Sequence, residues 1–508
     1  MRFDVVLQSH ASRKPSQAAV VMADGSLTYR ELYENAECVA SALIDYGVAP
    51  GDRVALYLPN SLAYFQAFFG ILRAGGVVVP ISTWLTPAEM SYCYADSGAK
   101  VLIIGSEQRR EAAAVLDEIA GKIVVAGEGS DEGETPFFAL LETRAIERPE
   151  IPSTQEDCLI LYTSGTTGRP KGVVLTHENM VVTGLVNGLD WKIHPHDRFL
   201  VATPLANRTG TARIINSIGL GATLCVMRSF NPEEWVSFVE REEVTVVGSV
   251  PTMWKRLISL LEEGGRCPSL RTILVTGELF PVELNKRVRA ALPQARIVSF
   301  FGMTETGAVT SLDGDDQIHN SGSVGRATPG VELKVVDESL KRVPLGEVGE
   351  LLVRAGRPGT MLVMREYFKR PEANAEAFHE GWFRTGDLCR QDANGYVYIV
   401  DRKKDMIISG GMNIYSKEVE VAINSHEAVS DSAAVGVPDD QFGEAVAAFV
   451  QLKPGAKVSA DDIASHCLER IGRRKKPKYV FFVSEFPRNS IGKILKRALA
   501  DQAKTLIG

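Results

Sequence analysis

Leu161-Tyr-Thr-Ser-Gly-Thr-Thr-Gly-Arg-Pro-Lys-Gly172 directly follows an apolar strand pattern at residues 158–162. Residues 163–172 contain four small hydroxyl residues, three glycines and a lysine. Glycines let successive backbone N–H groups turn toward one anion, and the hydroxyls add further donors. Lys171 adds positive charge. The stretch therefore predicts a loop that neutralises a triphosphate at the end of a strand.

This loop differs from the Walker A motif. Pro170 precedes the lysine and Gly172 follows it, whereas GxxxxGK[ST] has glycine before the lysine and a hydroxyl residue after it. A kinase or ATPase of that class is therefore disfavoured. The alternative interpretation is a surface loop that is rich in serine, glycine and threonine and has no ligand.

Strand and helix patterns alternate on both sides of the loop. Capping-box spacing joins Thr28 to Glu31 and Thr86 to Glu89, and predicts that a helix begins at each site. Repeated apolar strands separated by helices indicate parallel sheets covered by helices, an α/β fold. Strands are expected at residues 54–58, 77–80 and 101–104, a helix at residues 65–73, an irregular polar stretch at residues 105–155, and renewed alternation at residues 158–310.

The carboxy-terminal part of the sequence has a different pattern. The chain of 508 residues is longer than one core usually supports, so two or more domains are expected. Residues 320–400 are rich in strand patterns, and the last hundred residues resemble a small α+β unit. The charged run Asp401-Arg-Lys-Lys-Asp405 lies between them. We expect a large domain at residues 1–403 and a small one at residues 404–508.

Composition narrows the range of partners. A net charge of −7 gives no reason to expect nucleic acid or an anionic membrane as a partner. The seven cysteines include no CxxC pair, which favours a reducing compartment over disulfides or a zinc site. No secretory h-region or membrane-length apolar run is present, so we expect a cytoplasmic protein with no integral membrane segment.

The phosphate loop resembles YTSGTTGxPKG, the hallmark of the adenylate-forming superfamily of acyl-CoA synthetases, luciferases and peptide-synthetase adenylation domains. The resemblance implies a large domain with a small β-barrel-like subdomain, and a small mobile C-terminal domain. Phe301-Gly-Met-Thr-Glu-Thr306 is similar to the superfamily motif YGxTE. This similarity implies that Phe301 stacks on adenine, Thr304 bonds the α-phosphate and Glu305 holds Mg²⁺, which favours oxygen ligands. The ATP-binding residues implied in this domain are Thr163, Ser164, Gly165, Thr166, Thr167, Gly168, Lys171, Gly277, Phe301, Gly302 and Thr304.

Later motifs follow in the order of the superfamily. Phe383-Arg-Thr-Gly-Asp-Leu388 is similar to YRTGDL, which implies that Asp387 accepts hydrogen bonds from both ribose hydroxyls. By the same resemblance, Arg402 is a second nucleotide contact and Lys404 is the hinge about which the C-terminal domain rotates. Pro487-Arg-Asn-Ser-Ile-Gly-Lys-Ile-Leu-Lys496 resembles PKTxxGKIxR, so that Lys493 is the adenylation lysine. The alternative for Lys493 is a solvated basic tail.

Ser409-Gly-Gly-Met-Asn413 resembles the superfamily segment SGGENI, in which Gly410 and Gly411 line a pantetheine tunnel. The alternative is a plain β-turn. By resemblance, Phe442 stacks on the adenine of coenzyme A. The basic run Arg473-Arg-Lys-Lys-Pro-Lys478 supplies Lys476 and Lys478 to the 3′-phosphate, or else forms a solvated face.

Thr203-Pro-Leu-Ala-Asn-Arg-Thr-Gly210 departs from relatives, many of which read PLxH with a histidine that gates the carboxylate. Here Asn207 and then Arg208 occupy this site. Arg208 pairs with Glu278 in one interpretation, and meets an anionic substrate group in another. Peptide-synthetase adenylation domains use an aspartate in the corresponding stretch to hold the substrate amino group. This stretch has no aspartate or glutamate, so the resemblance disfavours amino-acid substrates. The expected acid pocket consists of Asn207, Arg208, Trp254, Thr276, Ser299, Phe300 and Ala308, and leaves linear, branched and aryl acids open.

Together these motifs imply an ATP-dependent carboxylic acid–CoA ligase that works through an acyl-adenylate. ATP, Mg²⁺ and coenzyme A are its expected cofactor and co-substrates, a small carboxylic acid is its partner, and Lys493, Thr304 and Glu305 are its expected catalytic residues. The alternatives are an acyl-AMP ligase that delivers to a carrier protein, and a regulator with a dead site that binds nucleotide or acyl groups. A homodimer is common in the superfamily and is one expected assembly.

Overall fold

The computed structural model describes residues 1–144, 156–163, 169–488 and 494–507. The described chain forms two compact units, one of residues 1–333 with 353–383, the other of residues 334–352 with 384–508. Residues 384–403 group with the carboxy-terminal residues by this criterion. The boundary expected between residues 403 and 404 stays a prediction.

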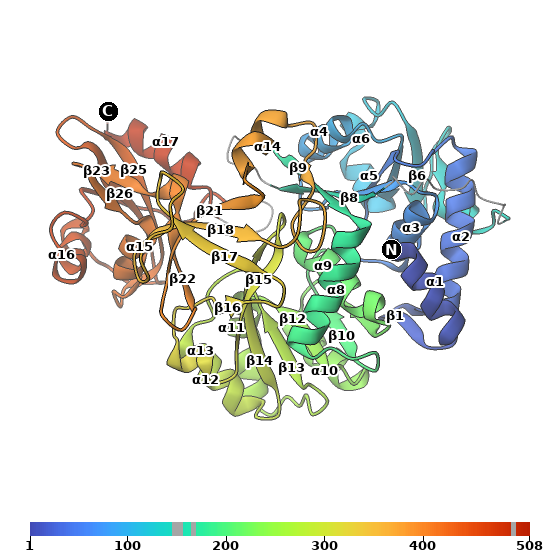
Figure 1. Cartoon of the computed structure of the whole chain (residues 1–508), viewed down its shortest axis with the longest axis horizontal. Helices are drawn as coiled ribbons and strands as arrows, with labels where there is room; N and C mark the ends of the chain where they lie inside the picture. Colours follow the sequence, from blue (N-terminus) through green and yellow to red (C-terminus); the bar gives the residue numbers. More distant parts are fainter. Residues whose placement is uncertain (145–155, 164–168, 489–493, 508) are drawn as a thin grey trace. The chain divides into compact units, whose positions relative to one another are not determined.

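The first unit is built on two sheets whose central strands are parallel (Figure 1). One sheet has the order β16-β15-β14-β13-β12-β10-β11-β1-β2, and the other β19-β9-β8-β4-β3-β5-β6-β7. The strands of the first sheet are β1 (Ala18–Met22), β2 (Gly25–Thr28), β10 (Arg198–Val201), β11 (Thr223–Val226), β12 (Val246–Ser249), β13 (Thr272–Val275), β14 (Arg296–Met303), β15 (Gly307–Asp313) and β16 (Arg326–Ala327). Those of the second are β3 (Arg53–Tyr57), β4 (Val77–Pro80), β5 (Val101–Gly105), β6 (Lys122–Ala126), β7 (Thr135–Pro136), β8 (Asp157–Thr163), β9 (Lys171–Thr176) and β19 (Glu366–Tyr367).

Helices connect the parallel strands, as the sequence pattern predicts. β5, β11, β12 and β13 are buried along their whole length. Strands covered on both faces are typically continuous apolar runs. The helices of this unit are α1 (Phe3–Arg13), α2 (Tyr29–Asp45), α3 (Leu62–Arg73), α4 (Pro87–Ser97), α5 (Ser106–Glu111), α6 (Ala113–Leu116), α7 (Phe137–Leu141), α8 (His177–Trp191), α9 (Arg208–Ser217), α10 (Pro232–Arg241), α11 (Pro251–Glu262), α12 (Val282–Ala291), α13 (Asp316–His319) and α14 (Pro371–Ala377), with a 3₁₀ turn η1 (Ile218–Leu220).

Local signals in the sequence were confirmed except in one region. Thr28 with Glu31, and Thr86 with Glu89, form complete capping boxes at the starts of α2 and α4. The irregular stretch expected at residues 105–155 was wrong for residues 106–141, which contain α5, α6, β6, β7 and α7. Each of these elements has at most six residues. Segments this short carry too little hydrophobic periodicity to be recognised from sequence.

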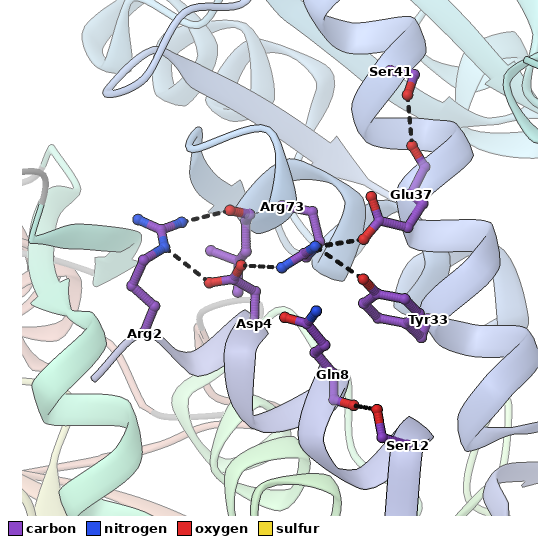
Figure 2. A network of polar contacts seen from close by, with 9 residues as sticks. Arg2, Asp4, Gln8, Ser12, Tyr33, Glu37, Ser41 and Arg73 are labelled. Atoms are coloured by element: carbon purple, nitrogen blue, oxygen red, sulfur yellow. Dashed lines mark hydrogen bonds and ion pairs between the residues drawn. The ribbon is translucent and has the colours of Figure 1, made fainter. Parts of the chain in front are cut away.

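A buried polar network joins α1, α2 and α3 (Figure 2). Arg73 Nη1 lies 3.1 Å from Asp4 Oδ2, and Arg73 Nη2 lies 2.5 Å from Glu37 Oε1 and donates to the Tyr33 hydroxyl at 3.1 Å. Arg2 Nε donates to the second oxygen of Asp4 at 3.1 Å. The Asp4 side chain is only 1% exposed. Each buried charge in this network is therefore paired, as burial requires.

Replacing Asp4 by asparagine is expected to destabilise the protein by about 1.5–3 kcal/mol, because hydrogen bonds to charged groups contribute in that range. Urea unfolding followed by tryptophan fluorescence measures the loss. Asp24→Asn is the matched control, since Asp24 pairs with Arg228 at a site where both side chains are at least half exposed. We expect the control to cost at most about 1 kcal/mol. Equal losses in both variants would contradict a stabilising role for the network.

The second unit contains most residues of a sheet with the order β17-β18-β21-β20, in which β22 also pairs with β21, and all of a sheet with the order β24-β23-β26-β25, in which β27 pairs with β26. The strands are β17 (Glu332–Val336), β18 (Gly349–Arg354), β20 (Phe378–His379), β21 (Trp382–Gln391), β22 (Val397–Arg402), β23 (Ile407–Ser409), β24 (Met412–Ile414), β25 (Val429–Asp439), β26 (Gly443–Leu452) and β27 (Tyr479–Phe482). The helices are α15 (Ser416–Asn424), α16 (Ala460–Ile471) and α17 (Lys496–Ile507), with a 3₁₀ turn η2 (Lys403–Asp405).

Two further observations concern the whole described chain. All seven cysteines are free thiols, and six of them are buried. Among the described residues, no helix combines the length and the apolar character that crossing a bilayer requires.

Candidate active site

The two ends of the predicted phosphate loop are paired residues on adjacent antiparallel strands. Thr163 ends β8, Lys171 begins β9, and the two residues pair across the antiparallel strands. Thr163 Oγ1 donates to the Lys171 carbonyl at 3.4 Å. The strand expected before the loop is confirmed as β8. The predicted ATP-binding residues Ser164, Gly165, Thr166, Thr167 and Gly168 lie outside the described residues.

A tyrosine links Lys171 to the predicted metal ligand Glu305. Lys171 Nζ lies 5.2 Å from the centroid of the Tyr367 ring, in cation–π geometry. The Tyr367 hydroxyl donates to Glu305 Oε1 at 2.8 Å. The structure thus brings together two residues that the sequence pattern separates by more than a hundred positions. Tyr367 was missed because its strand, β19, has only two residues and pairs with β9.

Glu305 lies in the tight connection between β14 and β15. Its side chain is buried, and its carbonyl accepts a hydrogen bond from the Met364 amide at 2.7 Å. The neighbouring Thr304 and the predicted adenine-stacking Phe301 are partly exposed. A side chain at Gly302 would overlap the Gly307 carbonyl and approach Ala308 Cα to 3.0 Å. The glycine at 302 is therefore required by the hairpin itself, whatever its role toward a nucleotide.

Six of the predicted acid-pocket residues lie after β13, in the hairpin strands β14 and β15, or at the start of α9. Thr276 follows β13, and its Oγ1 donates to the Phe300 carbonyl on β14 at 3.1 Å. Ser299 donates to Gln317 at 3.3 Å, and Phe300 packs on Trp191 with ring centroids 4.7 Å apart. Ala308 is buried on β15, and Asn207 is the N-cap residue of α9. Gly277, which is predicted to contact the nucleotide, is exposed and has a φ of +94°. Open sheets of this type bind ligands at the carboxyl ends of their strands.

Trp254, a predicted acid-pocket residue, belongs to the hydrophobic core of the first unit. It is completely buried in the core between the first sheet and helices α10 and α11, where its ring meets Trp235 edge-on at 5.8 Å. Its Nε1 donates to Ser249 Oγ at 2.7 Å. Trp254 is therefore part of the core, where its polar atom has a partner, and its place in the acid pocket stays a prediction.

The expected structural pair between Arg208 and Glu278 is also wrong. Glu278 is exposed, while Nε and Nη1 of Arg208 are buried without a hydrogen-bond partner among the described residues. Burial lowers the pKa of Arg208 to about 10, an effect that the nearby Glu305 carboxylate opposes. The carboxylate that acts on the charge of Arg208 is thus that of the predicted metal ligand.

In the second unit, the two predicted nucleotide contacts meet each other. Asp387 on β21 is opposite Arg402 on β22, and Arg402 Nε lies 2.6 Å from Asp387 Oδ1. Asp387 is almost fully buried. Lys404, the predicted hinge, is exposed in η2, and its neighbour Lys403 pairs with Glu350 at 3.1 Å. The charged run therefore spans the last two residues of β22 and the turn η2, before β23 begins at Ile407.

The predicted coenzyme A residues are partly brought together. Gly410 and Gly411 form the turn between β23 and β24, with φ of +56° and +76°. The Gly410 amide donates to the Phe442 carbonyl at 2.8 Å, and a Cβ at Gly410 would lie 3.1 Å from the Phe442 ring. Phe442 is exposed on 47% of its surface. This aromatic ring next to a two-glycine turn fits both the β-turn interpretation and the tunnel interpretation.

The lysines predicted to bind the 3′-phosphate, Lys476 and Lys478, differ in their hydrogen-bond partners. Lys478 Nζ lies 2.6 Å from Asp439, and this hydrogen bond raises the pKa of Lys478. A 3′-phosphate would have to compete with that carboxylate. Lys476 is partly buried, and its amide donates to the Gly472 carbonyl at 3.2 Å. Lys493 lies outside the described residues, so its predicted role rests on the sequence motif.

Comparison with known proteins gives a consistent family. The model of the AMP-binding enzyme family matches residues 7–368, and that of the AMP-binding enzyme C-terminal domain matches residues 418–493. The long-chain-fatty-acid–CoA ligase FadD13 of Mycobacterium tuberculosis is 35% identical over 98% of this chain and 97% of its own length. A feruloyl-CoA synthase of Amycolatopsis is 36% identical over 96% of each chain.

Solved structures agree across the whole length. ATP-bound MatB from Rhodopseudomonas palustris superposes with a TM-score of 0.89 at 29% identity, covering 100% of both chains. The o-succinylbenzoate-CoA synthetase MenE of Bacillus subtilis, in complex with its acyl-adenylate intermediate, has a TM-score of 0.85 at 30% identity, covering 97% of each chain.

Proposed function

The chain belongs to the AMP-binding enzyme family, and from that membership we propose that it is an ATP-dependent carboxylic acid–CoA ligase. In the first half-reaction, a carboxylate oxygen attacks the α-phosphorus of ATP and pyrophosphate leaves. In the second, the sulfur of coenzyme A attacks the acyl carbon, the bond to AMP breaks, and the thiol proton is lost. The observation that supports the proposal best is the Lys171–Tyr367–Glu305 arrangement in the first unit.

This arrangement fits a magnesium nucleotide. Magnesium usually binds one or two carboxylates together with phosphate oxygens and water, and Glu305 is one buried carboxylate that Tyr367 links to Lys171. Among the described residues, no cluster of three or more histidine, cysteine or acidic side chains is placed to hold a metal by itself. The bound ion would neutralise charge on the phosphates. The Tyr367 hydroxyl fixes the orientation of the Glu305 carboxylate, and Lys171 supplies a cation at the end of the loop.

We assign the remaining roles from the motifs. Thr304 donates to the α-phosphate, Phe301 stacks on adenine, and Asp387 with Arg402 holds the ribose. Lys493 supplies positive charge while oxygen joins phosphorus, Lys404 is the hinge, and Gly410, Gly411 and Phe442 serve the second half-reaction. A cytoplasmic location is supported by the seven free cysteines. A homodimer remains a prediction from the family resemblance.

Acid-dependent release of pyrophosphate from ATP tests the proposal. We expect release with at least one class of acid in a panel of fatty, branched, aryl and dicarboxylic acids, and thioester formation when coenzyme A is added. Adenylate formation without a thioester would instead favour an acyl-AMP ligase that delivers to a carrier protein. The absence of pyrophosphate release with every acid would favour a binding protein and overturn the proposal.

Gly410→Val is expected to slow thioester formation by about 10-fold or more, while acid-dependent pyrophosphate release stays near the wild-type rate. The new side chain would meet the Phe442 ring and would sit at a backbone φ that costs on the order of 1–3 kcal/mol for a residue with a Cβ. Stopped assays of the two half-reactions measure the split.

The matched control is Gly455→Val, because Gly455 also has a positive φ, of +78°, but a Cβ there would meet nothing within 4 Å. The control carries similar backbone strain away from the two-glycine turn. If Gly455→Val slowed thioester formation as much as Gly410→Val, the loss would reflect strain in the unit and would contradict a coenzyme A role for Gly410.

A further inference from the structure

Arg213 on α9 is a buried cation without a counter-ion. It is only 2% exposed, and its buried Nη1 has no hydrogen-bond partner among the described residues. Its neighbours are aromatic: the guanidinium carbon lies 5.4 Å from the Phe199 ring centroid and 5.7 Å from that of Phe300. Cation–π contacts offset part of the cost of burial, but a buried charge normally has an opposite charge as well.

The charged group that acts on Arg213 is another arginine. Burial and the positive charge of Arg208 lower the pKa of Arg213 to about 10. Arg208 itself has two buried nitrogens without partners, and the carboxylate that affects it is Glu305, which already accepts a hydrogen bond from Tyr367. The Glu305 carboxylate thus acts on Arg208, whereas the charged group that acts on Arg213 is the positive charge of Arg208.

Two glycines leave room for the two guanidinium groups. A Cβ at Gly248 on β12 would overlap Arg213 Nε and lie 2.6 Å from its guanidinium carbon. A Cβ at Gly307 would lie 3.1 Å from Arg208 Nη2 and 3.9 Å from Thr183 Oγ1. Both arginine side chains therefore pack tightly against the backbone at these glycines.

Other buried polar atoms without partners lie on the same two helices. α8 and α9 pack against each other, and Asn187 on α8 donates to Asn216 Oδ1 on α9 at 3.2 Å. Thr183 Oγ1, Trp191 Nε1 and Asn216 Nδ2 are buried donors without an acceptor, and Asn187 Oδ1 and Asp190 Oδ2 are buried acceptors without a donor. With the arginine nitrogens included, donors predominate. Buried polar atoms normally have hydrogen-bond partners, so this surplus of donors can accommodate a further acceptor from a bound ligand.

We propose that the acid substrate carries a second carboxylate, and that Arg213, assisted by Arg208, binds it. The inference rests on the proposed ligase function and names its substrate class. The Glu305 carboxylate acts on Arg208 at the start of α9, whereas Arg213 lies five residues further along the helix, about 7.5 Å at the helical rise. That separation assigns Arg213 to a group distant from the reacting carboxylate. A guanidinium presents a planar fork of donors that matches a carboxylate.

The test compares acids of equal length with one or two carboxylates, both straight-chain and aromatic, in the pyrophosphate-release assay. We expect wild type to prefer the dicarboxylate of the best pair by about 10- to 100-fold in kcat/KM, the range that one hydrogen-bonded charged group supplies. Arg213→Met is expected to abolish this preference while the KM for ATP and the rate with the monocarboxylate are retained.

A purely structural arginine would behave differently. Replacing it would lower the thermal midpoint of the free protein, whereas removing an uncompensated buried charge is expected to raise that midpoint or leave it unchanged. Dicarboxylate is expected to raise the midpoint of wild type and to have no effect on Arg213→Met. Gly248→Ala keeps the charge of Arg213 but displaces its guanidinium, so it is expected to weaken the preference for dicarboxylates. This variant replaces Arg213→Met in the test if Arg213→Met does not fold.

The outcomes separate the inference from the function on which it rests. Pyrophosphate release with monocarboxylates and no preference for dicarboxylates would overturn the inference and leave the ligase proposal intact. An unchanged preference in Arg213→Met would do the same. If no acid gave pyrophosphate, the ligase proposal would fail, and the thermal shift with dicarboxylate would then decide on the binding of a second carboxylate by itself.

Discussion

Lys493→Ala is expected to lower acid-dependent pyrophosphate release by about 100- to 1,000-fold, by analogy with the loss of one donor that stabilises developing charge. When a carboxylate attacks the α-phosphate, two anions approach and charge grows on the phosphoryl oxygens. A lysine ammonium that meets both groups stabilises the transition state more than the separated reactants. The rate is measured under saturating ATP with the best acid of the panel.

The second half-reaction provides an internal comparison. Thioester formation from synthetic acyl-adenylate and coenzyme A is expected to proceed at nearly the wild-type rate in Lys493→Ala, because no phosphoryl charge develops in that step. Lys504→Ala is the matched control, since Lys504 is an exposed lysine of α17 that pairs with Asp501 at 3.2 Å. An equal loss of pyrophosphate release in both variants, or wild-type release in Lys493→Ala, would contradict the adenylation role.

Local sequence signals predicted the scaffold well because they depend on near neighbours. The strand expected at residues 77–80 is β4, and the helix start at Thr86 has the predicted capping box. Apolar runs between helices predicted parallel sheets because strands covered on both faces have little need of polar residues. Elements of only a few residues at 106–141 escaped detection for the opposite reason.

Side-chain partners were harder to predict, because they depend on contacts between segments far apart in the chain. Tyr367 completes the link from Lys171 to Glu305, yet nothing around it in sequence distinguishes it from a surface tyrosine. Trp254 follows β12 at a spacing compatible with either a pocket or a core, and packing against Trp235 placed it in the core. Arg213 gave no signal in the sequence, because the absence of a counter-ion is visible only after folding.

Glu305→Gln is expected to lower kcat/KM for ATP by about 100-fold or more and to raise the magnesium concentration needed for half-maximal rate. The amide keeps the shape of the side chain and an oxygen for the Tyr367 hydroxyl, but it loses the negative charge that a hard divalent cation favours. Magnesium titrations at fixed ATP measure the shift. Glu278→Gln, at an exposed site on the same unit, is the control and is expected to titrate like wild type.

The Glu305 carboxylate also acts on Arg208, so its replacement removes the negative charge that opposes the lowered pKa of that arginine. The role of Glu305 toward magnesium and its effect on Arg208 make different predictions for binding of the acid substrate. If Glu305 serves only magnesium, the preference for a second carboxylate should be unchanged in Glu305→Gln, whereas loss of its charge near Arg208 should tighten the binding of an anionic substrate. Tyr367→Phe distinguishes them further, because it keeps the Glu305 charge and removes only the hydrogen bond that orients it. We expect Tyr367→Phe to require more magnesium and to keep the wild-type acid preference. A wild-type magnesium titration in both Glu305→Gln and Tyr367→Phe would rule out the metal role of Glu305.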